Sequence, residues 1–196
     1  MSSRALPVDS VDADRAPARS SGATVWLTGL PSAGKTTIAT AVAARLRAQD
    51  RRVEVLDGDV VRTVLSTELG FSRADRDANV DRIGWVAATL ARHGVIVLAS
   101  VISPYAAARA GVRARHDAEA LPFLEVHVAT PVEICAERDV KGLYAKQRSG
   151  DIAGLTGVDG DYEPPLNPEL RLDTSGRSID DVVDELVASL HKENLL

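Results

Sequence analysis

The sequence predicts an α/β fold in three layers, with a five-stranded, mostly parallel sheet, helices on both faces and a lid segment. Short apolar runs alternate with stretches of helical periodicity from residue 23 onward, which is the order of a parallel sheet with crossover helices. The run GVIVLAS at 94–100 is apolar throughout, as expected for a strand covered on both faces. The run TVWLT at 24–28 leads into a glycine-containing loop and then into a helical pattern.

The strands and helices can be placed in chain order. We expect strands at 24–28, 51–56, 94–100, 122–128 and 169–174. We expect helices after the GKTT sequence, at about 75–92, at 105–120, after Pro131 and at 179–190. In the first helix, the aliphatic part of Arg45 would cover apolar surface. Residues 141–166 are rich in Gly, Lys, Asp and Pro and predict an ordered loop region.

Length and composition suit one domain. We expect it at 23–196, after an N-terminal tail at 1–22 that has no periodicity. A formal charge of −5 argues against a general nucleic-acid or membrane binder, and no apolar run reaches the roughly 20 residues of a membrane span. The single cysteine, Cys135, excludes an internal disulfide framework. One cysteine fits a reducing cytosol, and we expect a cytoplasmic protein. The N-terminus lacks the apolar core of a secretory signal.

The most informative motif is GLPSAGKT, which fits the phosphate-binding pattern G-x-x-x-x-G-K-[ST]. Backbone N–H groups of such a loop, and of the helix after it, surround the phosphates of a nucleotide. Lys35 can reach the β- and γ-phosphates, and Thr36 can ligate Mg²⁺, with Thr37 as a substitute. A chance lysine after a glycine turn would not explain the strand before the loop and the helix after it. The motif therefore predicts a P-loop NTPase fold that binds ATP or GTP.

Two absences narrow the class of enzyme. The chain has no guanine-reading N-K-x-D sequence, and the run VIVLAS lacks the terminal aspartate of the Walker B type. Both absences favour a small-molecule kinase over a regulatory GTPase or a motor.

The second strand leads into LDGDVVR. The carboxyl ends of parallel strands lie at one edge of the sheet, so we expect Asp57 and Asp59 near the γ-phosphate. A carboxylate there can accept a proton from an acceptor hydroxyl or help to hold Mg²⁺. Arg62 follows one helical turn later and would face the same cleft. The alternative is a turn followed by a surface helix.

The segment LGFSRADRDANVDRI predicts a helix N-terminus, because Ser72 can cap it and Asp75 lies in its first turn. Arg76 and Asn79 share one helix face, where they could bind an anion and the polar edge of a ligand. Phe71 either stacks on a planar base or only packs against the helix.

Two later segments complete the predicted site. VISPYAAAR follows the third strand, and backbone groups of Ile102 and Ser103 could contact a substrate, although Ser103 could be only a helix cap. Residues 138–157 contain several glycines and four cations, Arg138, Lys141, Lys146 and Arg148. We expect a lid at about 138–166 that shields the phosphate from water; the alternative is a solvated basic loop.

Together these segments resemble one family, adenylylsulfate (APS) kinase. The matching pieces are GLPSAGKTT, LDGDVVR, LGFSRADRDANVDRI, ISPY, RDVKGLYAK, LTGVDGDYEPP and PEL, in family order from Gly29 to about Leu170. The phosphate loop is generic, whereas DGDxxR, GFSxxDRxxN and DVKGLYxK are specific in combination. The resemblance implies an ATP- and Mg²⁺-dependent transfer of the γ-phosphate to the 3′-hydroxyl of adenosine 5′-phosphosulfate, in sulfate assimilation.

The resemblance also implies roles for the matching residues. Lys35, Asp59 and Ser103 would be catalytic, and Thr36 and Asp59 would hold the metal. Family descriptions label the serine of ISPY a phosphoserine intermediate, but direct in-line transfer requires only positioning and charge stabilisation. The residues that would bind ATP are Gly29, Leu30, Pro31, Ser32, Ala33, Gly34, Lys35, Thr36, Thr37, Arg138 and Thr174. Those that would bind adenylylsulfate are Asp57, Asp59, Arg62, Phe71, Arg76, Asn79, Ile102, Ser103, Lys141, Gly154 and Leu155.

Three places depart from the family pattern. Pro31-Ser32 stands where Ser-Gly is usual, and proline removes one N–H from the phosphate cradle. Asp81 replaces a common arginine. Leu155 replaces a phenylalanine that would cover the substrate adenine opposite Phe71, a loss of roughly 1 kcal/mol. The departures bear on affinity more than on the type of reaction.

Two other functions stay open: a related P-loop kinase for another nucleotide or alcohol, and a nucleotide-binding subunit that regulates a sulfurylase. A degenerate subunit would be expected to lose part of the catalytic set, which is intact here: Lys35, Thr36, Asp59, Arg62, Arg76, Asn79 and Lys141. By resemblance alone we expect a homodimer and a possible association with ATP sulfurylase.

Overall fold

The computed structural model of the protein describes residues 22–196, so that the predicted tail lies outside the described residues except for Gly22. Gly22 is buried, and a side chain there would collide with the carbonyl oxygens of Ala91 and Val95. The folded part therefore includes one residue that the sequence pattern assigns to the tail.

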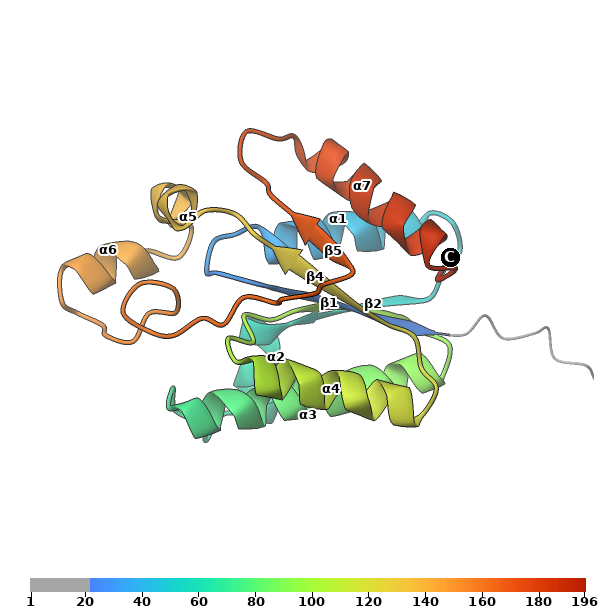
Figure 1. Cartoon of the computed structure of the whole chain (residues 1–196), viewed down its shortest axis with the longest axis horizontal. Coiled ribbons are helices and arrows are strands. Elements are labelled where there is room, and N and C mark those ends of the chain that lie inside the picture. Colours follow the sequence, from blue (N-terminus) through green and yellow to red (C-terminus); the bar gives the residue numbers. More distant parts are fainter. Residues whose placement is uncertain (1–21) are drawn as a thin grey trace, which may run out of the picture.

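Five strands form one parallel sheet in the order β2-β3-β1-β4-β5 (Figure 1). The strands are β1 (Ala23–Gly29), β2 (Val53–Asp57), β3 (Ile96–Ser100), β4 (Phe123–Val128) and β5 (Leu170–Leu172). All four pairings between neighbouring strands are parallel, which confirms the predicted sheet. Because β1 lies in the centre, the loop after β1 begins in the middle of the carboxyl edge, where ligands of open α/β sheets bind.

Helices cover both faces of the sheet, as predicted. They are α1 (Lys35–Arg47), α2 (Gly58–Leu65), α3 (Arg73–Arg92), α4 (Ala106–Ala118), α5 (Val132–Arg138), α6 (Leu143–Arg148) and α7 (Ile179–Lys192). Figure 1 shows α1 and α7 on one face and α3 and α4 on the other. Two apolar cores result: one contains Leu27, Ile38 and Leu186, and the other contains Trp26 and Ile83.

The helix that carries Arg76 and Asn79 begins where its sequence predicts. Ser72 Oγ accepts a hydrogen bond from the backbone N–H of Asp75, and the Asp75 carboxylate accepts one from the N–H of Ser72. This reciprocal capping satisfies two N–H groups that the first turn leaves without partners. The start of α3, and with it the position of its polar face, is therefore fixed by local sequence.

Two expectations need correction. The segment 141–166 is not loop throughout, because α6 forms within it. The carboxylate of Asp139 accepts hydrogen bonds from the N–H groups of Tyr144 and Ala145 and so supports the first turn of α6. Arg45 does more than cover apolar surface, since its guanidinium pairs with Asp184 on α7. Over residues 22–196, no helix is both long and apolar enough to cross a membrane.

Candidate active site

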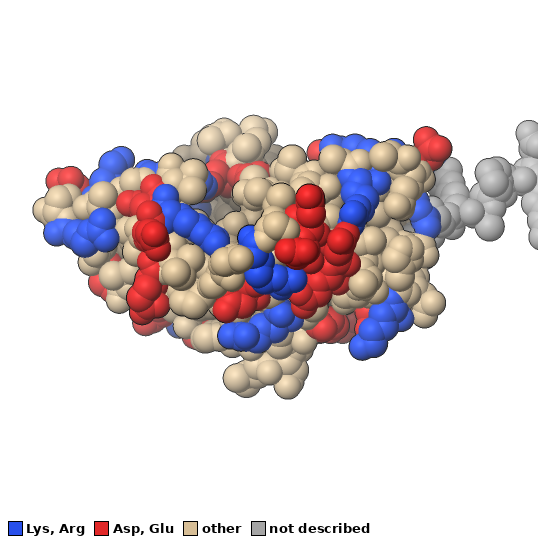
Figure 2. Space-filling view, turned by 90° about the horizontal axis from the view of Figure 1, so that it is seen from above, with Lys and Arg blue, Asp and Glu red and all other residues tan. Residues whose placement is uncertain are grey.

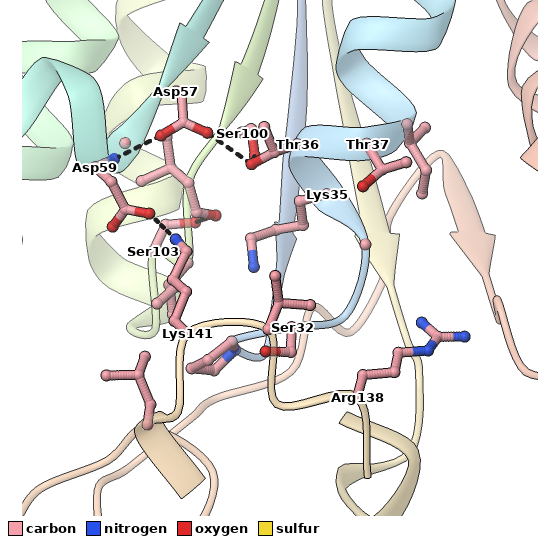
Figure 3. Close-up of a pocket in the computed structure, with 18 of the residues that line it drawn as sticks. Ser32, Lys35, Thr36, Thr37, Asp57, Asp59, Ser100, Ser103, Arg138 and Lys141 are labelled. Atoms are coloured by element: carbon pink, nitrogen blue, oxygen red, sulfur yellow. Dashed lines mark hydrogen bonds and ion pairs between the residues drawn. The ribbon is translucent and has the colours of Figure 1, made fainter. Parts of the chain in front are cut away.

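A cavity of about 450 Å³ lies at the carboxyl edge of the sheet (Figure 3). It is bounded by the loop before α1, the ends of β2 and β3, the start of α3, the segment after α5 and the connection from β5 to α7. The residues singled out in the sequence that line it are Pro31, Ser32, Gly34, Lys35, Thr36, Thr37, Asp57, Asp59, Arg62, Phe71, Arg76, Asn79, Ile102, Ser103, Arg138, Lys141 and Thr174. The fold thus brings most of the predicted site residues to one cavity.

The phosphate loop curls tightly between β1 and α1. Ser32 and Gly34 have positive φ angles of 59° and 103°. A side chain at Gly29 would lie 2.4 Å from the carbonyl oxygen of Val128, so only glycine fits there. Ser32 Oγ is buried and has no hydrogen-bond partner among the described residues. A buried polar atom normally has a partner, which makes this hydroxyl a free group for a ligand in the loop.

Lys35 lies deep in this loop. Its Nζ donates hydrogen bonds to the carbonyl oxygens of Gly29, at 2.9 Å, and of Leu30, at 2.7 Å. Burial lowers the pKa of Lys35 from 10.5 to about 7, and the nearby cation Lys141 acts in the same direction. An anion bound in the loop would oppose this shift, because it favours the charged amine.

The hydroxyl of Thr36 contacts residues at the ends of β2 and β3. Thr36 Oγ1 donates to Asp57 Oδ2 at 2.6 Å and lies 3.0 Å from Ser100 Oγ (Figure 3). The other Asp57 oxygen accepts the N–H groups of Asp59 and Val60 and caps α2. Three side-chain oxygen atoms of the kind that ligate Mg²⁺ therefore lie together at the start of α1.

Asp59 pairs with Lys141, which belongs to the segment between α5 and α6. The sequence assigned Thr36 and Asp59 to the metal, but the structure pairs Thr36 with Asp57. The ion pair of Asp59 and Lys141 instead connects the start of α2 to the predicted lid.

Ser103 is buried, with 1% of its surface exposed. Its Oγ accepts a hydrogen bond from Trp26 Nε1 at 3.0 Å and donates one to the carbonyl oxygen of Val101 at 3.4 Å. The alternative role as a helix cap is wrong, since α4 begins after Tyr105 without a side-chain cap. The geometry gives the Ser103 hydroxyl a structural part, and its predicted catalytic role has no support in these contacts.

Phe71 lies at the mouth of the cavity and is 73% exposed. The guanidinium of Arg62 lies over its ring, 4.4 Å from the centroid, and Arg62 also donates to the carbonyl oxygens of Leu69 and Gly70. Arg62 therefore covers one face of the ring. Deeper in the cavity, Asn79 Oδ1 is buried without a hydrogen-bond partner among residues 22–196, which suits it to a polar ligand.

Arg76 joins α3 to the far part of the lid. Its guanidinium donates to the carbonyl oxygen of Phe71 at 2.9 Å, to Thr156 Oγ1 at 2.7 Å and to the carbonyl oxygen of Gly154 at 3.0 Å. Gly154 and Leu155 do not line the cavity. Leu155 is 7% exposed and belongs to the apolar core beside α1 and α7. The sequence interpretation, which counted Leu155 in the substrate pocket at the place of a family phenylalanine, does not match this position.

On the side of the cavity near α5 and α7, Arg138 connects the end of α5 to the segment after β5. Its guanidinium donates to Thr174 Oγ1 at 2.8 Å and to the carbonyl oxygen of Thr174 at 2.9 Å, and Thr174 in turn donates to the carbonyl oxygen of Ala33 in the phosphate loop. The lining also includes Ser100 and Arg177, which the sequence analysis missed. Ser100 ends β3 and Arg177 follows β5, so the rule that placed Asp57 at the carboxyl edge would have found them.

The face of the molecule viewed in Figure 2 has no large patch of a single charge sign. Lys and Arg side chains alternate there with Asp and Glu side chains. On that face, long-range attraction of a polyanion therefore has no obvious source.

Comparison with known proteins gives a consistent result. A family model described as adenylylsulphate kinase matches residues 21–173. The adenylyl-sulfate kinase of Synechococcus sp. (strain JA-3-3Ab) is 54% identical over 175 residues, which cover 89% of this chain and 97% of that protein. The structure of the Mycobacterium tuberculosis APS kinase CysC in complex with AMPPNP and APS has a TM-score of 0.84 and 45% identity, covering 87% of this chain and 98% of that chain.

A hexameric APS kinase from Thiobacillus denitrificans is 39% identical, with a TM-score of 0.69; the match covers 92% of this chain but 31% of that chain. The family model and the closely similar relatives extend over nearly the whole described part of the chain. The resemblance seen in the motifs is thereby confirmed: this chain belongs to the adenylylsulfate kinase family.

Proposed function

We propose that this protein is an adenylylsulfate kinase, which transfers the γ-phosphate of ATP to the 3′-hydroxyl of adenosine 5′-phosphosulfate. The products are ADP and 3′-phosphoadenosine 5′-phosphosulfate. One observation carries the proposal: a single cavity joins the phosphate loop to Asp57, Asp59 and the groups on α3 that suit an adenine nucleotide. The relative solved with AMPPNP and APS, at 45% identity, supports the same pair of ligands.

On the donor side, ATP would lie with its phosphates in the loop around Lys35 and its adenine near Arg138 and Thr174. The unpartnered Ser32 Oγ and the buried amine of Lys35 fit a polyanion there. Lys35 would exchange its bonds to the Gly29 and Leu30 carbonyl oxygens for phosphate oxygens.

The residues beside Thr36 fit a magnesium ion. An Asp57 carboxylate oxygen and the Ser100 hydroxyl oxygen lie within hydrogen-bond distance of Thr36 Oγ1. Mg²⁺ prefers one or two such oxygen ligands, completed by phosphates and water. Across residues 22–196, no three His, Cys, Asp or Glu side chains form a metal-binding group. We infer that phosphate oxygens of the nucleotide and water would complete the coordination. When bound, Mg²⁺ neutralises charge on the phosphoryl group in transfer.

On the acceptor side, Asp59 is our candidate for the group that takes the proton of the 3′-hydroxyl. Its carboxylate is held at the N-terminus of α2, and its partner Lys141 can turn to the anionic substrate when the lid closes. The Phe71 ring, which is 73% exposed, would receive the adenine, while Asn79 would bind a polar edge of the nucleotide. Ser103 takes no covalent part in this mechanism, because in-line transfer needs only the two ligands held in position.

Further inferences concern the domain, the location and the assembly of the protein. We infer one kinase domain at 23–196 with a lid at about 138–166, and a cytoplasmic enzyme. A homodimer or a larger assembly is consistent with the hexameric relative from Thiobacillus denitrificans. An association with ATP sulfurylase rests on the family resemblance alone.

The test is a coupled assay of ADP release with ATP, Mg²⁺ and adenylylsulfate, beside reactions with AMP, ADP or adenosine in its place. We expect stimulation by adenylylsulfate at micromolar concentrations and a product that carries phosphate at the 3′ position. A kinase for another nucleotide or alcohol would be indicated if adenylylsulfate up to the millimolar range gave no stimulation.

A further inference from the structure

Arg109 on α4 is a buried cation beside the cavity, with 4% of its surface exposed. Its guanidinium makes three hydrogen bonds to three segments that are distant from one another in the sequence. Nε donates to Glu125 Oε1 on β4 at 2.8 Å, Nη1 to the carbonyl oxygen of Ser103 at 2.7 Å, and Nη2 to the carbonyl oxygen of Glu163 at 2.7 Å.

The first of these segments is the loop between β3 and α4, in which Ile102, Ser103 and Pro104 line the cavity. Ser103 has a φ of 41°, in the left-handed region that residues with a side chain adopt only under constraint. Two bonds supply the constraint: Arg109 holds the Ser103 carbonyl group and Trp26 holds its hydroxyl.

The second segment is the end of the predicted lid. The N–H of Glu163 donates to the carbonyl oxygen of Pro104 at 2.8 Å, and Glu163 Oε2 accepts the N–H of Ala106 at 2.7 Å. The Glu163 carboxylate also lies 3.6 Å from Arg73. The end of the predicted lid is therefore hydrogen-bonded to the loop that lines the cavity. Arg109 binds the loop at Ser103 and the lid at Glu163.

We propose that Arg109 is a positioning residue for the acceptor nucleotide, which fixes the 102–104 loop and the end of the lid in one arrangement. The proposal rests on the proposed function, because that function defines which ligand occupies this part of the cavity. A planar guanidinium can donate in three directions at once, which a lysine ammonium on a flexible chain does poorly. Glu125 compensates the buried charge, so that the cation can be retained at this depth.

The test compares Arg109→Lys with Arg113→Lys. Arg113 lies one helical turn further along α4. Its ion pairs within residues 22–196 go to Glu169 and to Glu125, the carboxylate that Arg109 also binds, and not to the 102–104 loop. For Arg109→Lys we expect KM for adenylylsulfate to rise about threefold to tenfold, as loss of a buried hydrogen bond would give, with KM for ATP nearly unchanged. Arg113→Lys should leave both KM values unchanged. A lower Tm in both variants with both KM values intact would overturn the proposal.

A second measurement does not depend on adenylylsulfate. In hydrogen–deuterium exchange, the amides of residues 102, 103, 105 and 106 and of residues 160–163 should exchange faster in Arg109→Lys than in the native protein, but not in Arg113→Lys. If the native enzyme showed no adenylylsulfate-dependent ADP release, the proposed function would fail while this measurement still tested Arg109. Unchanged exchange in Arg109→Lys would refute its positioning role.

Glu163→Ala provides the test should Arg109→Lys not fold. This variant removes the bond to Ala106 and the pair with Arg73 without altering the buried guanidinium. We expect faster exchange in the same two segments and a smaller rise in KM for adenylylsulfate. If exchange and KM both stayed at native values, the link between lid and loop would have no part in binding.

Discussion

Thr36 Oγ1 donates a 2.6 Å hydrogen bond to Asp57 Oδ2, whereas Asp59 pairs with Lys141. The two aspartates of DGD therefore serve different parts of the cavity. Asp57 lies beside the threonine of the phosphate loop, and Asp59 faces the lid. In the mechanism that we propose, Asp57 would help to hold the metal and Asp59 would accept the proton of the 3′-hydroxyl.

The first prediction is a contrast between Asp57→Asn and Asp59→Asn. The Asp57→Asn variant would keep an acceptor for the α2 cap but lose the charge beside Thr36, so the Mg²⁺ concentration for half-maximal ADP release should rise. The Asp59→Asn variant should have a kcat lower by about a hundredfold or more, as for loss of a general base, with little change in the Mg²⁺ requirement. Initial rates measured over a series of Mg²⁺ concentrations distinguish the two variants. If Asp59→Asn raised the Mg²⁺ requirement and Asp57→Asn lowered kcat, Asp59 would be the metal ligand.

The second prediction concerns the proton on Lys35. With a pKa of about 7 in the free protein, the amine is largely neutral at about pH 8.5. Bound triphosphate raises this pKa, so binding of a non-hydrolysable ATP analogue above pH 7 should take up a proton. Calorimetric titrations in buffers of different ionisation enthalpy measure this uptake. In Lys35→Arg the uptake should disappear, because a guanidinium stays protonated; uptake that persists would assign the proton to another group.

The third prediction revises the interpretation of Leu155. The missing aromatic ring suggested that Leu155→Phe would lower KM for adenylylsulfate. Because Leu155 lies in the apolar core, the larger ring should instead destabilise the protein by about 1–3 kcal/mol and leave KM unchanged. Thermal melts and initial rates on the same preparation decide the matter. A lower KM without loss of Tm would restore the stacking role.

The fourth prediction is a loss of stability in mild acid. Both ring nitrogens of His116 are engaged, Nδ1 with the Val112 carbonyl oxygen and Nε2 with Thr24 Oγ1, and burial lowers the pKa of His116 below 6.5. Burial, helped by Arg171 and Arg109, lowers the pKa of His127 to about 4. Below pH 6.5 the unfolded chain therefore binds more protons than the folded one, and stability falls as pH falls.

The measurement is the difference in Tm between about pH 7.5 and pH 5. His116→Gln and His127→Gln should each reduce this difference, even where the variant is less stable at both pH values. If neither variant altered the difference, carboxylates elsewhere would account for the acid sensitivity.

Much of the fold follows from local patterns. The apolar runs that predict β1, β3 and β4 form strands within two residues of the expected bounds. The α3 cap at Ser72 follows from short-range hydrogen bonds that Ser and Asp can form at this spacing where a helix begins. The short helix α6 escaped prediction because six residues give too little periodicity, and its first turn depends on Asp139.

By itself, the sequence determined the phosphate loop, the parallel sheet and the family, because these depend on spacing along the chain and on the types of residue. It also determined which segments reach the carboxyl edge. Only the tertiary structure decided that Asp57 and not Asp59 bonds Thr36, that Leu155 turns into the core, and that Arg109 joins the cavity loop at Ser103 to the lid at Glu163. These choices depend on the direction of each side chain where distant segments meet, which a linear pattern does not specify.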